Sequence, residues 1–254
     1  MQKLLFVFVF SLALVSCKKD EVDPVVIDVT ELELHYDDDY RFELTQNGER
    51  ISSSDFTWKS SNEKVGTIDA DGIFFAERIG ETTITATDGT STLSSLVTIV
   101  PYSTLAKEPV LDWGTNRANV ESKEPRERQS SANTVKDGVV TQEVSYKSAN
   151  EKLREVVYVF EDDKLTTAAL LLANTQDVAA ESIIFLEERY SFVKNEDNIF
   201  IYSDPEKATV GLQVHETIGL IVIYLPYKSG GRLSTESDDF KSLFLAEVRR
   251  LEQR

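Results

Sequence analysis

FTWKSSNEKVGTIDADGIFFAERIGETTITAT, residues 56–87, is the stretch that decides the fold of the N-terminal part of the chain. Apolar and polar residues alternate at both of its ends, which is typical of strands with one buried face. Asp71-Gly72 lies between two such runs, and a glycine there allows the positive φ that a tight hairpin needs. Trp58 lies in the first run, where we expect it to fill a core between two sheets. The stretch therefore predicts short strands packed as a β-sandwich.

Similar alternating runs lie on both sides of this stretch, and together they predict a β-sandwich that spans residues 25–100. They are VVIDVTELELHY, YRFELT and SSLVTIVP, residues 25–36, 40–45 and 94–101. The block resembles the bacterial Ig-like domains of group 2. The resemblance rests on Trp58, Ser60-Ser61-Asn62, Val65, the Asp71-Gly72 turn, Gly80 and the Thr/Ile alternation of residues 82–87. It implies a spacer or adhesion module of a bacterial surface protein. Gly66 departs from the family pattern, which usually has Ala there; because one small residue replaces another, the departure puts little in doubt about the resemblance.

Two acidic clusters in the sandwich could be cation sites or turns. DADG, residues 69–72, looks like half of a calcium loop, but the further ligand positions and the closing Glu do not follow. Asp37-Asp38-Asp39 lies at a corner between strands, where acids are more often a solvated turn. We therefore expect turns at both places, and neither a metal ion nor a cofactor.

The chain begins with a targeting sequence. Lys3 precedes the apolar run LLFVFVFSLAL, residues 4–14, which is shorter than the about 20 residues that a membrane-spanning helix needs. Leu14-Val15-Ser16-Cys17 follows and resembles the lipobox of bacterial lipoproteins. The resemblance implies a signal peptide of residues 1–16 and an acylated Cys17 that anchors the chain in a membrane. The alternative is an ordinary cleaved signal peptide with a chance cysteine.

Residues 17–24 are predicted to form a lipidated tether. CKKDE, residues 17–21, looks like the start of mature lipoproteins of Bacteroidota. In those proteins a Lys- and acid-rich tract after the cysteine is associated with export to the outer face of the outer membrane. The resemblance implies a surface-exposed protein, lipid-anchored in the outer membrane. The charges also fit a solvated, extended tether, and both interpretations can hold together.

The composition limits the partners of the protein. The formal net charge is -17 at pH 7, so the folded chain repels the phosphates of DNA and RNA, and we expect no nucleic-acid partner. The single cysteine excludes an internal disulfide. A chain of 254 residues is long enough for two domains, each with its own core.

A linker is predicted at PYSTLAKEP, residues 101–109, which has a proline at both ends and little periodicity. Because it is short, we expect the two domains to touch. The second domain is predicted to span residues 110–254. Its first element is a short helix capped by Thr115 or Asn116. Residues 123–138 are charged and polar, which predicts a loop.

The rest of the second domain alternates strands with helices. Three strands precede a helix that has Asp177 available as its cap, and three more strands precede a terminal helix. This order predicts an α+β domain with an antiparallel sheet and helices on one face, so the whole chain is expected to be mainly β. The predicted elements are VVTQEVSYK, REVVYVFED, KLTTAALLLA, the helix in DVAAESIIFLEERYSFVKN, NIFIYSD, ATVGLQVHE, IGLIVIYLPY and the helix in STESDDFKSLFLAEVRRLEQR.

Three of these strands are apolar on both alternating faces: EVVYVFED, NIFIYSD and GLIVIYLPY. One face is expected to meet the helices, and the other carries aromatic residues that form a candidate ligand face. An exposed aromatic patch would mark contact with an envelope protein or a surface glycan. The alternative, which the usual burial of such residues favours, is that they are core or are covered by the Ig-like domain. The five residues are Tyr158, Phe160, Phe200, Tyr202 and Tyr224.

No set of residues in the chain indicates a catalytic reaction. Neither His35 nor His215 has a catalytic cysteine or a glycine-framed serine to pair with, so no catalytic residue is assigned. We therefore predict a non-catalytic envelope lipoprotein whose Ig-like spacer presents the C-terminal domain for binding to a protein or a glycan. A periplasm-facing structural or inhibitory subunit that docks one envelope protein stays open. So does a glycan hydrolase, because 44 acidic residues allow many carboxylate pairs.

Overall fold

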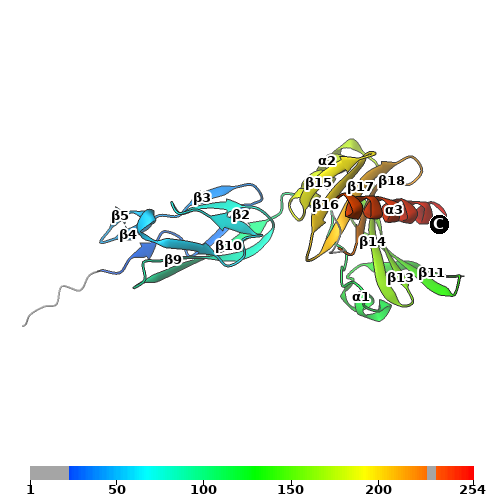
Figure 1. Cartoon of the computed structure of the whole chain (residues 1–254), viewed down its shortest axis with the longest axis horizontal. Helices are drawn as coiled ribbons and strands as arrows, with labels where there is room; N and C mark the ends of the chain where they lie inside the picture. Colours follow the sequence, from blue (N-terminus) through cyan, green and yellow to red (C-terminus); the bar gives the residue numbers. More distant parts are fainter. Residues whose placement is uncertain (1–22, 228–232) are drawn as a thin grey trace, which may run out of the picture.

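The structure, a computed structural model, describes residues 23–227 and 233–254 and, within the last helix, the side chains from residue 239 onward. The chain is mainly β, as predicted. A β-sandwich and a domain built on one large sheet lie end to end (Figure 1).

Ten strands form the sandwich. Side chains from its three sheets share one core, which includes Phe42, Trp58, Phe74 and Ile84. One sheet has the order β2 (Glu31–His35), β10 (Thr92–Val100), β9 (Gly80–Thr87) and β6 (Thr57–Ser60); a second has β1 (Val26–Ile27), β4 (Leu44–Gln46) and β5 (Glu49–Ile51); the third has β3 (Asp39–Arg41), β8 (Ile73–Ala76) and β7 (Gly66–Ile68).

The residues that decide the sandwich occupy the predicted positions. Trp58 is buried, and its indole Nε1 donates to the carbonyl of Ser53 at 3.0 Å, in the short 3-10 turn Ser53–Asp55. Gly72 has φ +75° in the turn between β7 and β8. The carboxylate of Asp69 accepts the N–H groups of Asp71 and Ile73, both at 2.9 Å. These acids therefore close a turn, as predicted.

Gly66 has a packing role that the sequence did not predict. A Cβ at this position would lie 2.1 Å from a ring carbon of Phe74 and 2.7 Å from the carbonyl oxygen of Phe75. Phe74 is fully buried, so its ring uses the space that a methyl group would need. Glycine therefore fits this position in this chain, whereas alanine would require the ring of Phe74 to move.

The second domain is built on one antiparallel eight-stranded sheet. Four strands and a helix are followed by four more strands and a second helix. The last strands of the two halves, β14 and β18, pair with each other in the centre of the sheet. The sheet order is β11 (Glu127–Lys136), β12 (Val139–Lys147), β13 (Leu153–Glu161), β14 (Lys164–Leu172), β18 (Gly219–Leu225), β17 (Ala208–His215), β16 (Ile199–Asp204) and β15 (Ser191–Glu196).

Two of these strands were not predicted. Residues 123–138 contain β11 instead of a loop, and all ten residues of this strand are exposed, so no buried face marks it in the sequence. The predicted helix of residues 177–195 is shorter: α2 (Gln176–Glu187) ends before β15 begins. Its cap is Thr175 rather than Asp177, because the Thr175 hydroxyl accepts the N–H of Val178 at 3.3 Å.

The helices cover both faces of the sheet, not one face as predicted. On one face, α1 (Arg117–Lys123), which is capped by Asn116, and α2 pack on a core that contains Tyr158 and Tyr224. On the other face, α3 (Leu233–Glu252) packs on Val157, Ile221 and Ile223 through its own phenylalanines. Gly211 lets α3 approach closely, since a Cβ there would lie 2.5 Å from the ring of Phe244. Because both faces are apolar, both have to be covered.

The substitution Gly66→Ala is expected to lower the free energy of unfolding by about 1–3 kcal/mol, because the added methyl overpacks against Phe74. Urea denaturation of Gly66→Ala, Phe74→Leu and the double variant would measure this. The smaller side chain in the double variant should relieve part of the clash, so its loss should be less than the sum of the two single losses. Strictly additive losses would contradict the packing argument.

Candidate functional site

The segment that joins the two domains, residues 101–116, is here called the strap. It has no helix or strand, yet it lies against the second domain along its length. Leu105 is fully buried in the aromatic core. Further along, the N–H of Val110 donates to the hydroxyl of Tyr158 at 2.8 Å, and the N–H of Gly114 donates to the carbonyl of Leu165 at 3.0 Å. The strap is therefore part of the second domain's fold, although its first residues were predicted to be a linker.

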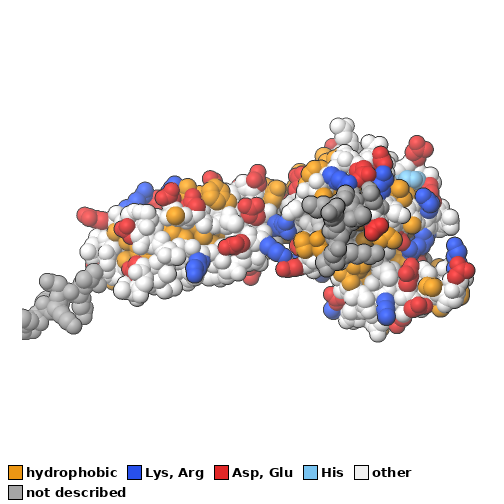
Figure 2. Space-filling view, viewed as in Figure 1, with side chains coloured by type: hydrophobic (Ala, Val, Ile, Leu, Met, Phe, Trp, Pro, Cys, Tyr) orange, Lys and Arg blue, Asp and Glu red, His pale blue; other side chains and the backbone are white. Residues whose placement is uncertain are grey.

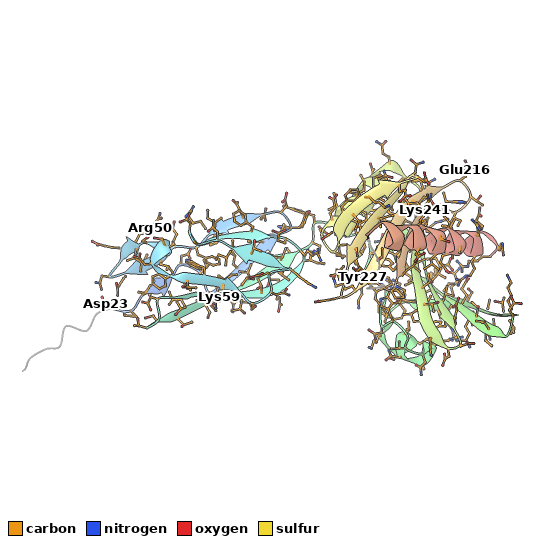
Figure 3. The ribbon with its side chains drawn as sticks, viewed as in Figure 1. Asp23, Arg50, Lys59, Glu216, Tyr227 and Lys241 are labelled. Carbon is orange, nitrogen blue, oxygen red and sulfur yellow. The ribbon has the colours of Figure 1, made fainter. Side chains whose placement is uncertain are left out.

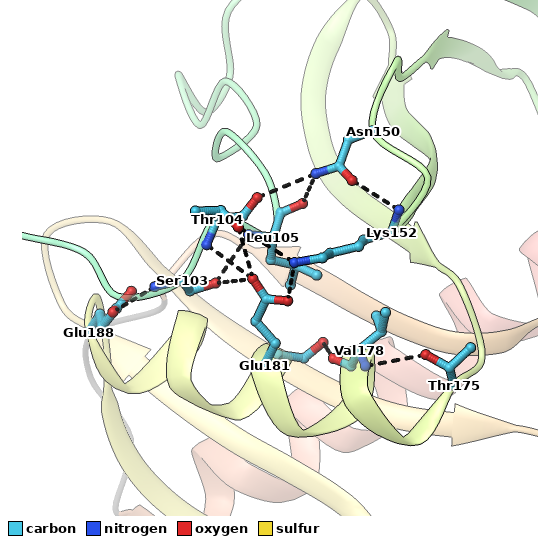
Figure 4. A network of polar contacts seen from close by, with 10 residues as sticks. Ser103, Thr104, Leu105, Asn150, Lys152, Thr175, Val178, Glu181 and Glu188 are labelled. Atoms are coloured by element: carbon cyan, nitrogen blue, oxygen red, sulfur yellow. Dashed lines mark hydrogen bonds and ion pairs between the residues drawn. The ribbon is translucent and has the colours of Figure 1, made fainter.

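Glu181 of α2 binds the strap at Thr104 (Figure 4). Its Oε1 accepts the N–H of Thr104 at 3.0 Å, and its Oε2 lies 2.7 Å from Nζ of Lys152. Asn150 adds a bond from its Nδ2 to the carbonyl of Leu105 at 2.7 Å. Burial alone would raise the pKa of Glu181, but Lys152 and the Thr104 N–H hold that pKa below its usual value. Because the pKa of Glu181 is lower in the folded chain than in the unfolded chain, the ionised carboxylate stabilises the fold. This stability is present above the usual pKa of a glutamate and is lost as the pH falls through the lowered pKa of the folded chain.

Glu188, just after α2, holds the start of the strap and the Ig-like domain together. Its side chain is fully buried, and its Oε1 accepts the N–H groups of Tyr102, at 2.5 Å, and Ser103, at 3.0 Å. Its Oε2 pairs with the guanidinium of Arg189 at 2.9 Å. Its main-chain carbonyl accepts the N–H of Ile79 in the Ig-like domain at 3.0 Å. Residues of both domains therefore meet at this glutamate.

Ion pairs complete the junction, where basic side chains meet acidic ones (Figure 2). Arg78 of the Ig-like domain lies 3.3 Å from the carboxylate of Asp204 at the end of β16, and it also donates to the hydroxyl of Ser191. Lys64 pairs with Glu206 at 2.7 Å and lies 3.8 Å from Asp204. Asp204 is only 4% exposed. A buried carboxylate is stable only when nearby charged groups compensate for its lost hydration. The ion pairs with Arg78 and Lys64 therefore stabilise Asp204 at the junction.

The five residues of the candidate ligand face share one face of the sheet, as the alternation predicted, but that face is covered. Tyr158 and Tyr224 are fully buried, Phe160 and Tyr202 are 1% exposed, and Phe200 is half-buried. The strap, α1 and α2 pack on the core that contains them. The exposed aromatic face is therefore wrong, and the alternative of a buried face holds, with the strap as part of the cover.

A row of buried tyrosines lies beneath the strap. Tyr158 donates to Oε2 of Glu124 at 2.5 Å, and Tyr190 donates to Oε1 of Glu108 at the same distance. The hydroxyl of Tyr224 is buried and has no hydrogen-bond partner in the part of the chain that the structure describes. Burial, followed by the nearby carboxylates, raises the pKa of all three tyrosines well above 10. Since their folded pKa values are raised, ionisation of these hydroxyls favours the unfolded chain: the stability of the fold is unaffected by them below pH 10 and is lost as the pH rises above that value.

Both histidines, the side chains that catalysis could have used, contact other residues. His35 stacks on Tyr102 at 4.4 Å between ring centroids, and His215 lies 3.6 Å from the carboxylate of Glu252. Among the described residues, no group of three or more His, Cys, Asp or Glu side chains is placed to hold a metal ion. Cys17, the predicted lipidation site, lies outside the described residues, as do residues 1–16. No helix in the described part of the chain is long and apolar enough to cross a membrane.

Sequence reasoning missed the residues that build the junction, notably Arg78, Glu181, Glu188 and Asp204. Arg78, Glu188 and Asp204 lie in short polar runs that look solvent-exposed, and an acid on a helix, such as Glu181, gives no sign of which segment it will bind. One signal was available. The shortness of the predicted linker indicated that the two domains touch, and they do.

The substitution Tyr224→Phe is expected to leave the free energy of unfolding unchanged or to raise it by about 1 kcal/mol, because it removes a buried hydroxyl that lacks a partner. Tyr190→Phe is the matched control and should lower that free energy by about 1–3 kcal/mol, because it leaves Glu108 without its donor. Urea denaturation at neutral pH would measure both. Equal losses in the two variants would contradict the placement of Tyr224.

Comparison with known proteins identifies one part of the chain. A similarity links the chain to domains 4–9 of the surface layer protein SbsC, at 11% identity and a TM-score of 0.29, over 83% of this chain and 28% of that one. Domains 5–6 of the S-layer protein SbsC show 10% identity and a TM-score of 0.27, over 83% and 86%. Scores this low establish no common fold. No curated protein matches the chain. The family model for the bacterial Ig-like domain (group 2) matches residues 21–99, so this part of the chain is such a domain.

Proposed function

We propose that the protein is a non-catalytic component of the bacterial cell envelope, in which the Ig-like domain is a rigid spacer between a lipid anchor at Cys17 and a C-terminal domain that binds a protein or a glycan. The observation that carries this proposal is the bonded junction between the two domains. A spacer holds its cargo at a fixed distance only if the joint is stiff, and interdomain joints are mobile by default.

Three kinds of contact make the joint stiff. Ile79 is bonded to the main chain of Glu188, the side chain of Glu188 holds Tyr102 and Ser103, and Arg78 and Lys64 pair with Asp204 and Glu206. These contacts come from two separate loops of the sandwich and from the start of the strap, which follows its last strand. A hinge at residue 101 would have to break several of them together, which favours one orientation.

The direction of the spacer follows from its ends. Asp23 lies at the end of the Ig-like domain that is far from the second domain (Figure 3). The nine residues of β10 run along the sandwich to the junction, a length of about 30 Å at roughly 3.3 Å per residue. An anchor placed before Asp23 would therefore be separated from the second domain by the length of the sandwich.

The lipid anchor and the location belong to the proposal and rest on the sequence. Leu14-Val15-Ser16-Cys17 has the lipobox pattern, and several acyl chains on one cysteine make a stable anchor. The CKKDE tract supports display on the outer face of the outer membrane. Because the aromatic face is covered, the partner is expected to bind another surface of the C-terminal domain.

The substitution Arg78→Ala is expected to loosen the joint, because among the described residues it leaves the buried carboxylate of Asp204 with the more distant Lys64 as its one charged partner. Spin labels on Lys59→Cys and Glu216→Cys, one in each domain, would report the interdomain distance by pulsed electron resonance in a Cys17→Ala background. The parent should give one narrow distribution and Arg78→Ala a broad one. Arg50→Ala is the matched control, since Arg50 also pairs with a glutamate, Glu43, but lies at the far end of the sandwich (Figure 3). Equal widths in all three proteins would argue against a bonded joint.

The substitution Cys17→Ala is expected to abolish incorporation of labelled fatty acid and to move the chain from the membrane fraction to the soluble fraction, because it removes the acylated thiol. External protease on intact cells then tests the location. Surface display predicts digestion of the parent, whereas protection would favour a periplasm-facing subunit. A Cys17→Ala variant that stays in the envelope as the parent does would refute the anchor.

A further inference from the structure

The longest unpaired sheet edge in the described residues is β11. Its ten residues, ERQSSANTVK, are all exposed, and only β12 pairs with it. The other edge of this sheet, β15, is shorter, has a register shift in its middle, between Phe192 and Lys194, and is contacted by Arg78 at Ser191. The register shift of β11 lies near its start, between Arg128 and Ser130, and leaves the seven residues 130–136 in regular register. Short, bulged or covered edges resist pairing with another chain, and long open ones invite it. The edge at β11 is therefore the place where the sheet can be extended.

The backbone groups that β11 offers can be assigned from its hairpin. Asp137 and Gly138 both have positive φ, +51° and +84°, and form the two-residue turn between Lys136 and Val139. The residues that flank such a turn exchange hydrogen bonds, and hydrogen-bonded pairs then alternate with non-bonded ones. Thr134 and Ala132 therefore bond to β12, whereas the N–H and C=O groups of Ser131, Asn133 and Val135 point outward. Another strand would bond to these outward groups.

The charges of β11 indicate which strand fits. Glu127 and Lys136 lie at opposite ends of the strand, and everything from Gln129 to Val135 is uncharged. Arg128, next to Glu127, points to the other face of the sheet and is already paired with Glu121 at 3.2 Å. Neither Glu127 nor Lys136 has an ion-pair partner among the described residues. In an antiparallel pair of two identical strands, the acidic end of each copy meets the basic end of the other. The strand is thus complementary to itself in charge.

We propose that β11 pairs antiparallel with β11 of a second copy of this chain, around a two-fold axis at Ala132, to give one continuous sheet of two domains. In this register Ser131 faces Asn133 of the other copy, so the outward groups of both residues are satisfied. Gln129 is the extra residue at the register shift between Arg128 and Ser130, and this moves the pairing by one, so that Glu127 faces Lys136 of the other copy. Both side chains point to the α3 side of the sheet, because Glu127 pairs with Lys147 and Lys136 with Val139 of β12. This inference does not depend on the lipid anchor or on the partner of the C-terminal domain.

The first test is a charge swap. Sedimentation equilibrium of the full chain in density-matched detergent should show a concentration-dependent dimer. Lys136→Glu should weaken the dimer about tenfold, because two attractive contacts become repulsive, and Glu127→Lys should do the same. The double variant should restore the parent's affinity. A parent that is monomeric at all concentrations, or a double variant no better than the single ones, would overturn the proposal.

The second test fixes the register and the identity of the partner strand. The Cα atoms of a non-hydrogen-bonded antiparallel pair are about 4.5 Å apart, which a disulfide can span. In a Cys17→Ala background, Ala132→Cys should therefore form an interchain disulfide under mild oxidation. Thr134→Cys is the matched control on the same strand and should not, because Ser130 faces it. Equal cross-linking in both variants, or none in Ala132→Cys, would overturn the proposed pairing.

Discussion

The constraint on which the rest of the structure depends is an eight-stranded sheet with two apolar faces. Val157, Ile221 and Ile223 lie on one face, while Tyr158 and Tyr224 lie on the other, and neither set can stay in water. The helix α3 covers the first face. The second face is too wide for the short α1 and the twelve-residue α2 alone, so the strap completes its cover.

This cover determines how the two domains are joined. The strap leaves the sandwich at Val100 and is bonded to Glu188 and Glu181 within its first residues, so little chain is left to act as a hinge. The Ig-like domain is consequently drawn onto the second domain, where Arg78 meets Asp204. A segment that completes a core thereby also sets the orientation of the spacer, which is the property that the proposed function requires.

The sequence predicted the parts of the fold in which one residue pattern has one physical solution. The alternation around Trp58 and the Asp71-Gly72 turn gave the sandwich, and six strands and the α1 cap of the second domain were also predicted. The strand β11 was missed because it buries no side chain, and β15 because Tyr190 continues the helical spacing of α2. Alternation placed Tyr158 and Tyr224 on one face, but the strap that covers them has no periodicity and so gave no signal.

The central claim is that the strap is a folded part of the second domain. Native-state hydrogen exchange of the full chain tests it most directly, since the amides of Ser103, Thr104, Val110 and Gly114 are bonded in this account. The account predicts that these amides exchange as slowly as those of the central strands β13 and β14. Exchange at the rate of an unstructured linker, with the strands still protected, would contradict it.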